Sequence, residues 1–581
     1  MSGFVRQYRC GQQEIPAAMK AWQVFGAGLE NFGRGEQPVE IEVPQPSSRE
    51  LLARVDAASL CFSDVKVLRL GGRHPRLYGR DLAAEPIVPG HEAALTIVKV
   101  GSDIADKFSI GDRFVVQADI FYQGVNLAFG YMLPGAFEQY VLLGKEILEG
   151  DEGLYLIPVQ PETGYAETAL SEPWACVIHA YHTDFRRRLV PDGVVWFIGS
   201  EQSEAYSLGA LAQEQQGPDR ILYTGVSAQL REELAVVARK WGAQLQEVPN
   251  AAAESIDELK KEVAPAGFDD IILLGQPAPD LVETTSAALS REGALVLVTD
   301  EPLARPVEID LGRIHYDYIR YLGCRDPDIS QAYRASRNPR LVAGGKVLMI
   351  GGGGPMGQMH VQLALESPDG PQVVVATDIA SGRLAVVAEQ FMPVADELGK
   401  QLICLNPEEL GQETFGRRLR EIAPDGFDDV VVMVPVAPLA VQAAQYVADG
   451  GVVNFFAGMP RGTMGQIDLS SVALDGVRYT GTSGSRIHDL EATLHMTESG
   501  QLSPNRSVAA IGGIEAAREG MGAVQDGQVP GKIVIYPQIE GLPLTRLDEL
   551  CQHLPDVASK LGIGSTWTNE AEIALLEHFL G

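Results

Sequence analysis

The chain has 581 residues, of which 45% are hydrophobic, and it carries a formal net charge of −31. This length exceeds what one hydrophobic core supports, so several domains are expected, and the negative charge disfavours nucleic acid and anionic membrane as partners because phosphates would be repelled. No apolar run approaches the length of about 18 residues that a membrane span needs, and residues 1–17 lack a signal-peptide core, so we expect a cytoplasmic protein without a membrane partner.

A β-rich region, about residues 19–144, and the segment after it carry three motifs with metal-ligating side chains. They are Cys61-Phe62-Ser63-Asp64, Gly90-His91-Glu92 and Ser171-Glu172-Pro173. A catalytic zinc takes about three protein ligands of thiolate, imidazole or carboxylate type and keeps one position open. Cys61, His91 and either Glu92 or Glu172 meet that requirement. Each also has an ordinary structural explanation, because Cys61 can be core, His91 can cap a turn and Glu172 can begin a helix.

Between the first two motifs, the loop GGRHPRLYGR from Gly71 to Arg80 concentrates positive charge in an acidic chain. Arginine forks suit phosphate, so this loop is a candidate site for a substrate phosphate. The candidate residues are Arg73, His74, Arg76 and Arg80. The alternative is a solvated or salt-bridged surface loop.

Farther along, one sequence pattern occurs twice. AYHTDFRRRLVPDGVVWFIGS from Ala180 matches AYRASRNPRLVAGGKVLMIGG from Ala332, and VEIDLGRIHYDYIRYLG matches GQIDLSSVALDGVRYTG. In both copies short β-rich runs alternate with helical stretches, the pattern of a doubly wound parallel sheet. We therefore expect an α/β fold that includes two tandem Rossmann-type domains.

The second copy carries a dinucleotide fingerprint. An apolar strand leads into Gly352-x-Gly354-x-x-Gly357, a helix follows, and a second strand ends at Asp378, about 20 residues on. The glycines allow a tight turn and a close approach to the pyrophosphate, and the helix N-terminus offers free N–H groups to the phosphates. Asp378 would bind the ribose hydroxyls and repel a 2′-phosphate, so we expect NAD rather than NADP. The expected cofactor site also includes Pro355, Met356 and Arg383.

The first copy lacks this fingerprint. Opposite the three glycines stand Ser200, Gln202 and Ala205, with Glu201 and Glu204 where a pyrophosphate would lie, and Gly225 stands opposite Asp378. Carboxylates at that position oppose an anionic ligand. We expect this copy to serve packing or oligomer formation rather than dinucleotide binding; the alternative is that it binds another ligand.

Taken together, these motifs resemble the zinc-dependent medium-chain dehydrogenase/reductase superfamily. The resemblance is carried by SLCFSDVK, IVPGHE, LSEPW and the fragment Gly111-Asp112-Arg113-Phe114-Val115. Longer matches, among them IGDRFVVQADIFYQG and VPGKIVIYPQIEGLPLT, resemble the L-sorbose-1-phosphate reductase and polyol dehydrogenase group, and we expect the first copy to interrupt that likeness.

The resemblance implies a GroES-like β-rich catalytic domain and one catalytic zinc held among Cys61, His91, Glu92 and Glu172. Residues 116–135 lack the cysteines of the family's structural-zinc lobe, so no structural zinc is expected. Ser63 would relay the substrate proton, Asp64 would orient His91, and Glu92 would act at the metal, in exchange with Glu172.

The expected domains follow the chain. They are an N-terminal extension over 1–18, the GroES-like zinc domain over 19–181 with 483–540, the degenerate Rossmann-like domain over 182–331, the NAD-binding Rossmann domain over 332–482, and a helical extension over 541–581. The last contains LDELCQHLPDVASKLG and NEAEIALLEHFL, whose apolar spacing predicts two amphipathic helices that pack on the body or on a sister subunit.

The expected activity is hydride transfer between NAD(H) and a secondary alcohol or ketone of a polyol or ketose, phosphorylated if the arginine loop reaches the cleft, in a homo-oligomer. An alternative keeps the same site but holds NAD tightly, so that internal redox produces epimerisation, elimination or carbon–carbon cleavage without net coenzyme turnover. A third interpretation is a non-catalytic nucleotide-sensing scaffold, which would not need the metal ligands.

Overall fold

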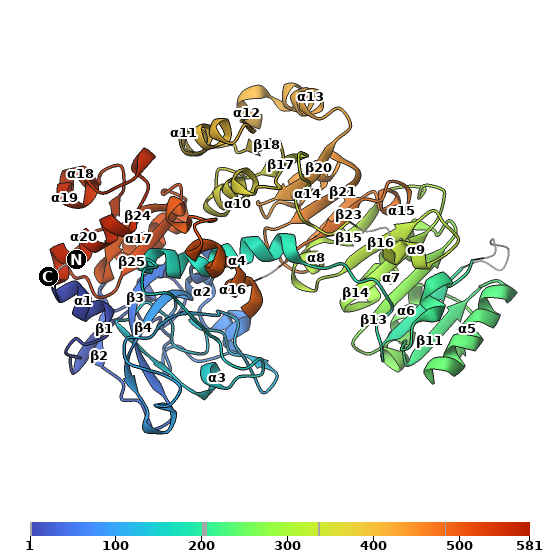
Figure 1. Ribbon diagram of the computed structural model, residues 1–581. Helices are drawn as coiled ribbons and strands as arrows, with labels where there is room; N and C mark the ends of the chain where they lie inside the picture. The colour runs from blue at the N-terminus through green and yellow to red at the C-terminus, as the bar shows by residue number, and fades with distance from the viewer. Residues whose placement is uncertain (1–2, 200–205, 252, 335–336, 483) are drawn as a thin grey trace. The chain divides into compact units, whose positions relative to one another are not determined.

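The computed structural model describes residues 3–199, 206–251, 253–334, 337–482 and 484–581 (Figure 1). The chain divides into two compact units. Unit 1 comprises residues 1–179, 354–359 and 484–581, and unit 2 comprises residues 180–353 and 360–483. Within the described ranges, no helix is both long and apolar enough to cross a membrane.

Unit 1 is built on an eight-stranded mixed sheet. Its spatial order is β26 (Thr545–Arg546), β24 (Val508–Gly513), β25 (Lys532–Tyr536), β3 (Leu51–Ser59), β4 (Glu92–Val100), β5 (Arg113–Val116) and β9 (Leu156–Pro158), with β8 (Tyr140–Leu143) paired to β3 off this path. Figure 1 shows β25 beside β3, where Val534 pairs antiparallel with Ser59. Segments from both ends of the chain therefore share one sheet and one hydrophobic core.

Further strands and helices begin within residues 1–179 and 484–581. They are α1 (Gly3–Arg9), β1 (Ala18–Ala21), β2 (Val39–Glu42), α2 (Phe62–Leu70), β6 (Phe121–Tyr122), β7 (Val125–Asn126), α3 (Lys145–Leu148), α4 (Tyr165–His182), α16 (Ile487–Glu498), α17 (Ala517–Asp526), α18 (Leu550–His553), α19 (Pro555–Ala558) and α20 (Asn569–Leu580). The segment LDELCQHLPDVASKLG forms two short helices, not one, because Pro555 has no N–H to continue the first helix and disfavours helical backbone at Leu554.

Unit 2 contains two six-stranded parallel sheets with the same strand order, which confirms the predicted duplication. The first is β12 (Gln244–Glu247), β11 (Arg220–Thr224), β10 (Val194–Ile198), β13 (Phe268–Leu274), β14 (Leu289–Val298) and β16 (Arg320–Cys324). The second is β19 (Gln401–Leu405), β18 (Val373–Thr377), β17 (Lys346–Ile350), β20 (Phe427–Val432), β21 (Val447–Phe455) and β23 (Arg478–Thr480). The helices of these copies are α5 (Ala228–Trp241), α6 (Ala253–Val263), α7 (Pro279–Ala288), α8 (Leu311–Tyr316), α9 (Ser330–Arg334), α10 (Pro355–Glu366), α11 (Ser381–Glu397), α12 (Pro407–Leu410), α13 (Gln412–Ile422), α14 (Ala437–Ala444) and α15 (Ser470–Leu474).

The two copies repeat side-chain contacts as well as topology. Arg186 Nη2 donates to Asp270 Oδ1 at 2.5 Å in the first copy, and Arg337 Nη2 donates to Asp429 Oδ1 at 2.6 Å in the second. Each arginine also donates to the backbone carbonyl of the residue before that aspartate, at 2.8 Å. Both aspartates are buried, so each carboxylate has a guanidinium partner that offsets the cost of its burial.

The copies join through a two-stranded antiparallel sheet of β15 (Val307–Asp310) and β22 (Met464–Ile467). Val307 pairs with Ile467, and Ile309 pairs with Gly465. Val307 and Gly465 hold equivalent places in the repeat, as do Ile309 and Ile467, so exchanging the copies maps the pairing onto itself. The contact is a pseudo-twofold one within a single chain.

The copies differ after their central strand. In the second copy β17 is followed by α10, whereas the described residues 206–219 of the first copy form only the short 3₁₀ helix η5 (Gly209–Gln213) before β11. Ser200, Glu201, Gln202, Glu204 and Ala205 lie outside the described residues. Gly225 directly follows β11, at the place of Asp378, with a φ of 55°. The described part of the first copy therefore offers neither a long helix N-terminus nor an acid at these two places.

Candidate metal centre and cofactor site

Two antiparallel strand ends bring the predicted metal ligands together in unit 1. β3 ends at Ser59, which pairs with Glu92 at the start of β4. Cys61 follows as the N-terminal cap of α2, and His91 directly precedes β4. The ligand atoms of Cys61, His91 and Glu92 lie within 4.8 Å of one another.

Asp64 is fully buried and ties this cluster to the backbone. Its carboxylate accepts hydrogen bonds from the backbone N–H of Cys61 at 3.1 Å and of Gly90 at 3.2 Å. It also lies 3.2 Å from His91 Nδ1. Burial alone would lower the pKa of His91, but the Asp64 carboxylate and the Cys61 sulfur raise that pKa well above its ordinary value. With Nδ1 engaged by Asp64, the ring nitrogen that faces the cluster is Nε2.

Ser63 lies between two of the candidate ligands. Its hydroxyl donates to Cys61 Sγ at 2.9 Å and lies 3.2 Å from His91 Nε2. Ser63 is half-buried. The Ser63 hydroxyl can therefore form a hydrogen bond with an oxygen atom of a molecule that binds between the cluster and solvent.

Lys532 is a buried member of the site that motif reasoning missed. Its Nζ lies 2.6 Å from the Glu92 carboxylate and donates to the Leu60 carbonyl at 3.0 Å. Burial would lower the pKa of Lys532, but Glu92 raises it above its ordinary value, so this ammonium neutralises the carboxylate. The available signal was a lysine at the head of the apolar strand KIVIY, since a buried lysine needs an anionic partner.

Glu172 on α4 interacts electrostatically with His91, Glu92 and Lys532. Burial raises the pKa of Glu172 to about 7; His91 and Lys532 act against this rise, and Glu92 adds to it. The thiol of Cys176 points at Glu172 Oε1 from 3.8 Å. Glu172 is not one of the three residues whose ligand atoms meet within 4.8 Å, so its role as a ligand stays a prediction.

The arginine loop lies near the cluster, and two of its arginines, Arg76 and Arg80, have protein partners. Arg76 pairs with Asp119 at 2.8 Å, and Arg80 donates to the carbonyls of Glu85 and Met132. Burial, with the nearby Arg76 and Lys66, lowers the pKa of His74 to about 4, so His74 is neutral at neutral pH.

One aromatic ring bridges the loop and the cluster. The Tyr131 ring centroid lies 5.4 Å from that of His74 and 5.9 Å from that of His91. The ring of Tyr131 thus separates the loop from the candidate metal ligand His91. The phosphate role of Arg73, His74, Arg76 and Arg80 stays a prediction.

In unit 2, Asp378 stands at the carboxyl end of the parallel sheet, directly after β18. A Cβ added to Gly353 would lie 2.8 Å from Asp378 Oδ2 and 2.9 Å from Arg383 Cβ. Gly353 is the unspecified middle residue of the fingerprint, and motif reasoning gave it no role. Here a glycine lets the turn approach the acid that is expected to bind the ribose. Pro355, Met356 and Gly357, which belong to unit 1, form the first turn of α10, and cofactor binding by the predicted residues stays a prediction.

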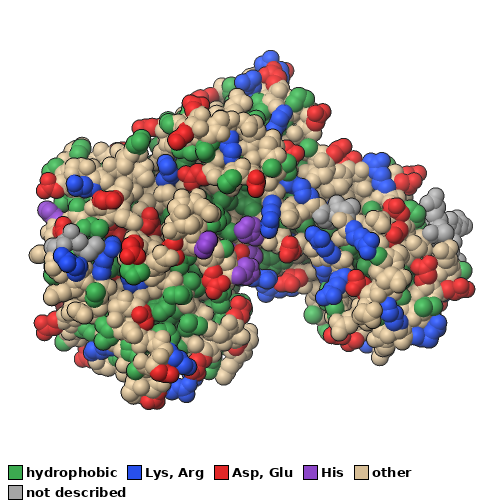
Figure 2. All heavy atoms as spheres, viewed as in Figure 1, with side chains coloured by type: hydrophobic (Ala, Val, Ile, Leu, Met, Phe, Trp, Pro, Cys, Tyr) green, Lys and Arg blue, Asp and Glu red, His purple; other side chains and the backbone are tan. Residues whose placement is uncertain are grey.

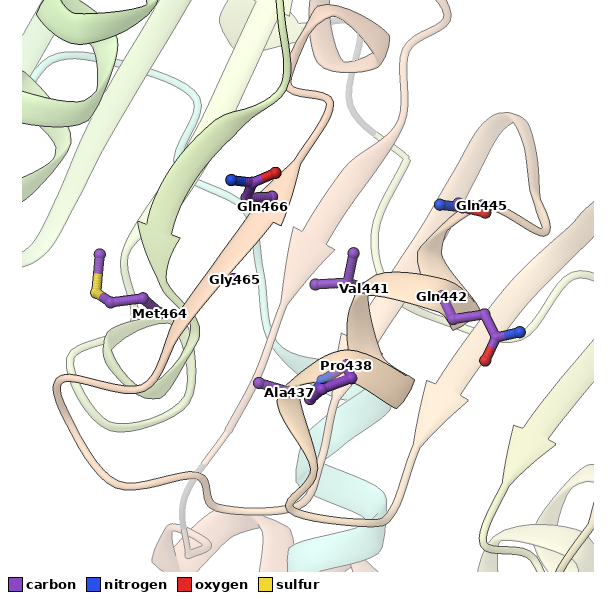
Figure 3. A pocket seen from close by; sticks show the side chains of 8 residues that line it. All are labelled: Ala437, Pro438, Val441, Gln442, Gln445, Met464, Gly465 and Gln466. Atoms are coloured by element: carbon purple, nitrogen blue, oxygen red, sulfur yellow. The ribbon is translucent and has the colours of Figure 1, made fainter.

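Two further observations concern the surface of the protein. A groove between α14 and β22 is lined by apolar side chains and by Gln442, Gln445 and Gln466, without a titratable group (Figure 3). On the face shown in Figure 2, acidic and basic side chains are interspersed.

The fold combines a GroES-like domain with two six-stranded parallel sheets. Residues 47–149 match the family described as "Alcohol dehydrogenase GroES-like domain". A mannitol-1-phosphate 5-dehydrogenase of Aliivibrio fischeri is 23% identical over 564 residues, which cover 94% of this chain and 96% of the relative. An L-sorbose 1-phosphate reductase of Klebsiella pneumoniae is 23% identical over 558 residues, which cover 95% and 97% of the two chains.

The chain belongs to the zinc-dependent medium-chain dehydrogenase/reductase superfamily. Its likeness to the sugar-phosphate dehydrogenases and reductases runs over nearly the full length. The expectation that the first copy interrupts this likeness is therefore wrong, because an alignment over 95% of the chain includes that copy.

Proposed function

We propose that the protein is a zinc- and NAD-dependent dehydrogenase that interconverts a secondary alcohol and a ketone on a phosphorylated polyol or ketose. The observation that carries this proposal is the meeting of Cys61, His91 and Glu92 within 4.8 Å. The names of the two relatives support a sugar-phosphate substrate, and Asp378 supports NAD.

The donor set fits zinc. Thiolate, imidazole and carboxylate are its usual protein ligands, and the Asp64 contact at Nδ1 is the kind of support that metal-bound histidines have. When bound, zinc would act as a Lewis acid on the substrate oxygen. Cys61, His91 and either Glu92 or Glu172 would hold it.

The chain's own residues supply orientation and proton transfer. Asp64 holds the His91 ring so that Nε2 faces the cluster. Ser63 lies within hydrogen-bonding distance of two candidate ligands, where its hydroxyl would pass the substrate proton toward solvent. Lys532 neutralises Glu92 and so limits the negative charge of the cluster.

The substrate phosphate would bind beside the arginine loop. Arg76 is 35% exposed at its side chain, and its guanidinium lies 5.3 Å from the Tyr131 ring centre. Asp119, its ion-pair partner, is less exposed, so a phosphate would have to compete with this carboxylate for Arg76.

The test is nicotinamide absorbance with zinc-replete protein, offered ketose phosphates, polyol phosphates and free polyols with NAD(H) or NADP(H). We expect net turnover with NAD(H) on a phosphorylated substrate, abolished in Cys61→Ser and retained in the control Cys551→Ser, since Cys551 is exposed and outside the cluster. Bound NAD without net turnover would favour internal redox. Absence of both metal binding and turnover would overturn the proposal.

A further inference from the structure

The helix that carries Glu172 is capped by a residue from the far end of the chain. Glu572, on α20, is fully buried, and its carboxylate accepts the backbone N–H of Tyr165 at 2.6 Å and of Ala166 at 2.8 Å. Tyr536 donates its hydroxyl to the same carboxylate at 2.9 Å. Tyr165 and Ala166 are the first two residues of α4.

This contact satisfies a general need of helices. The first N–H groups of a helix have no partner within it, and a negative charge there is favoured by the helix dipole. Most helices use a nearby side chain for this, but α4 uses a carboxylate that lies 406 residues away from Ala166 along the chain. Figure 1 shows both chain ends on unit 1, where α1 lies beside α20.

A second set of contacts fixes the same end of α4. Glu167 accepts from the backbone N–H of Gly164 at 3.0 Å, from Asn569 of α20 at 3.1 Å and from Asn505 at 2.9 Å. A Cβ on Gly164 would lie 2.2 Å from Asn569 Oδ1, so the two segments approach closely enough to require glycine.

The capped residues of α4 and the candidate ligand Glu172 belong to the same helix. Glu172 lies two helical turns, about 10 Å, beyond Tyr165 and on the same face of the helix. Pro173 follows directly, and its missing N–H removes the hydrogen bond that would tie the next turn to Ala169. The segment that presents Glu172 therefore depends on its N-terminal anchor more than an uninterrupted helix would.

We propose that Glu572 is a positioning residue for the metal site, through which the C-terminal helix α20 holds α4 and sets the place of Glu172. This inference rests on the proposed function in that Glu172 acts at the metal. In this proposal, the C-terminal helix α20 acts on the metal site through its contacts with the rest of unit 1 and does not cover the site.

The test uses the full-length protein with Co²⁺ in place of zinc, and the variants Glu572→Gln and Tyr536→Phe. Glu572→Gln removes the charge and leaves one of the two N–H groups without an acceptor. Tyr536→Phe is the matched control, because it removes a hydrogen bond to the same carboxylate and leaves both N–H contacts in place. We expect Glu572→Gln to weaken Co²⁺ binding about tenfold in chelator competition and to speed amide hydrogen exchange over residues 165–176, and Tyr536→Phe to do neither.

A purely structural role would lower the melting temperature of Glu572→Gln and leave its Co²⁺ affinity at the wild-type value. That result, or unchanged hydrogen exchange in α4, would overturn the inference. A wild-type chain that binds Co²⁺ but shows no turnover would count against the proposed substrate alone. A wild-type chain that binds no Co²⁺ would overturn the metal site itself, and the positioning role with it.

Discussion

At the scale of single residues, the geometry of the candidate metal site depends on the contact between Asp64 and His91. Asp64 is fully buried and contacts His91 and two backbone N–H groups from both sides of the cluster. We predict that Asp64→Asn weakens Co²⁺ or Zn²⁺ binding by about 10- to 100-fold. The neutral amide would not orient the His91 ring as the carboxylate does, and it has no negative charge to raise the basicity of that ring. Chelator competition with the purified protein measures this.

Asp489 offers a control of the same chemistry. It is also fully buried, and its carboxylate lies 2.8 Å from His179 Nδ1, but its partner His179, unlike His91, is not part of the three-residue cluster. Asp489→Asn should lower stability and leave metal affinity unchanged. Equal losses of affinity in both variants would show that Asp64 acts only through folding.

Glu138 provides a test of pH dependence. It is 4% exposed, and burial raises its pKa well above the ordinary value. A carboxyl that binds its proton more tightly in the folded chain stabilises the fold fully below its unfolded pKa, and this contribution is lost as the pH rises through the folded pKa. We predict that Glu138→Gln gains stability relative to wild type as the pH rises from about 5 to about 8. Urea midpoints at both pH values measure this, and a relative loss at high pH would contradict it.

At the scale of elements, the turn between β17 and α10 depends on a glycine that the fingerprint does not specify. A Cβ at Gly353 would press on Asp378 Oδ2 and Arg383 Cβ. We predict that Gly353→Ala weakens NADH binding about tenfold, equivalent to about 1.4 kcal/mol, because the ribose-binding acid must move. Fluorescence titration with NADH gives the dissociation constant.

Gly382→Ala is the matched control for this turn. Gly382 directly precedes Arg383, and a Cβ there would meet nothing within 4 Å. Its NADH affinity should stay at the wild-type value. If Gly353→Ala also keeps that value, the close contact at Asp378 does not matter for the cofactor.

The sequence predicted the elements that follow from local pattern, and it missed the contacts that join distant segments. Cys61, His91 and Glu92 could be predicted because each stands in a short motif with known ligand chemistry. Lys532 and Glu572 could not, since they reach Glu92 and the start of α4 from the other end of the chain. The arginine loop shows the same limit, because counting its charges did not disclose Asp119 as a partner.

At the scale of the whole molecule, the repeat predicted two sheets but not how they associate. The symmetric pairing of β15 with β22 is the kind of contact that usually joins two identical subunits. Here it lies within one chain, and one hydrophobic cluster includes Leu295 and Tyr321 of the first copy with Val453 and Tyr479 of the second. A homo-oligomer of this protein would therefore have to use another surface.

This shared core predicts that the two copies lose stability together. Ile467 is 2% exposed, pairs with Val307 of the first copy and belongs to the shared cluster. Ile221 is fully buried in a cluster that, apart from Ala332 and Tyr333, lies within the first copy. Each change to alanine should cost about 2–5 kcal/mol, since each empties a packed site. We predict that Ile467→Ala speeds hydrogen exchange in both sheets, independently of protein concentration, because the contact is intramolecular. Ile221→Ala should act mainly on the first sheet. If Ile467→Ala changes only the second sheet, the copies are independent domains, and the first copy does not support the nucleotide-binding one.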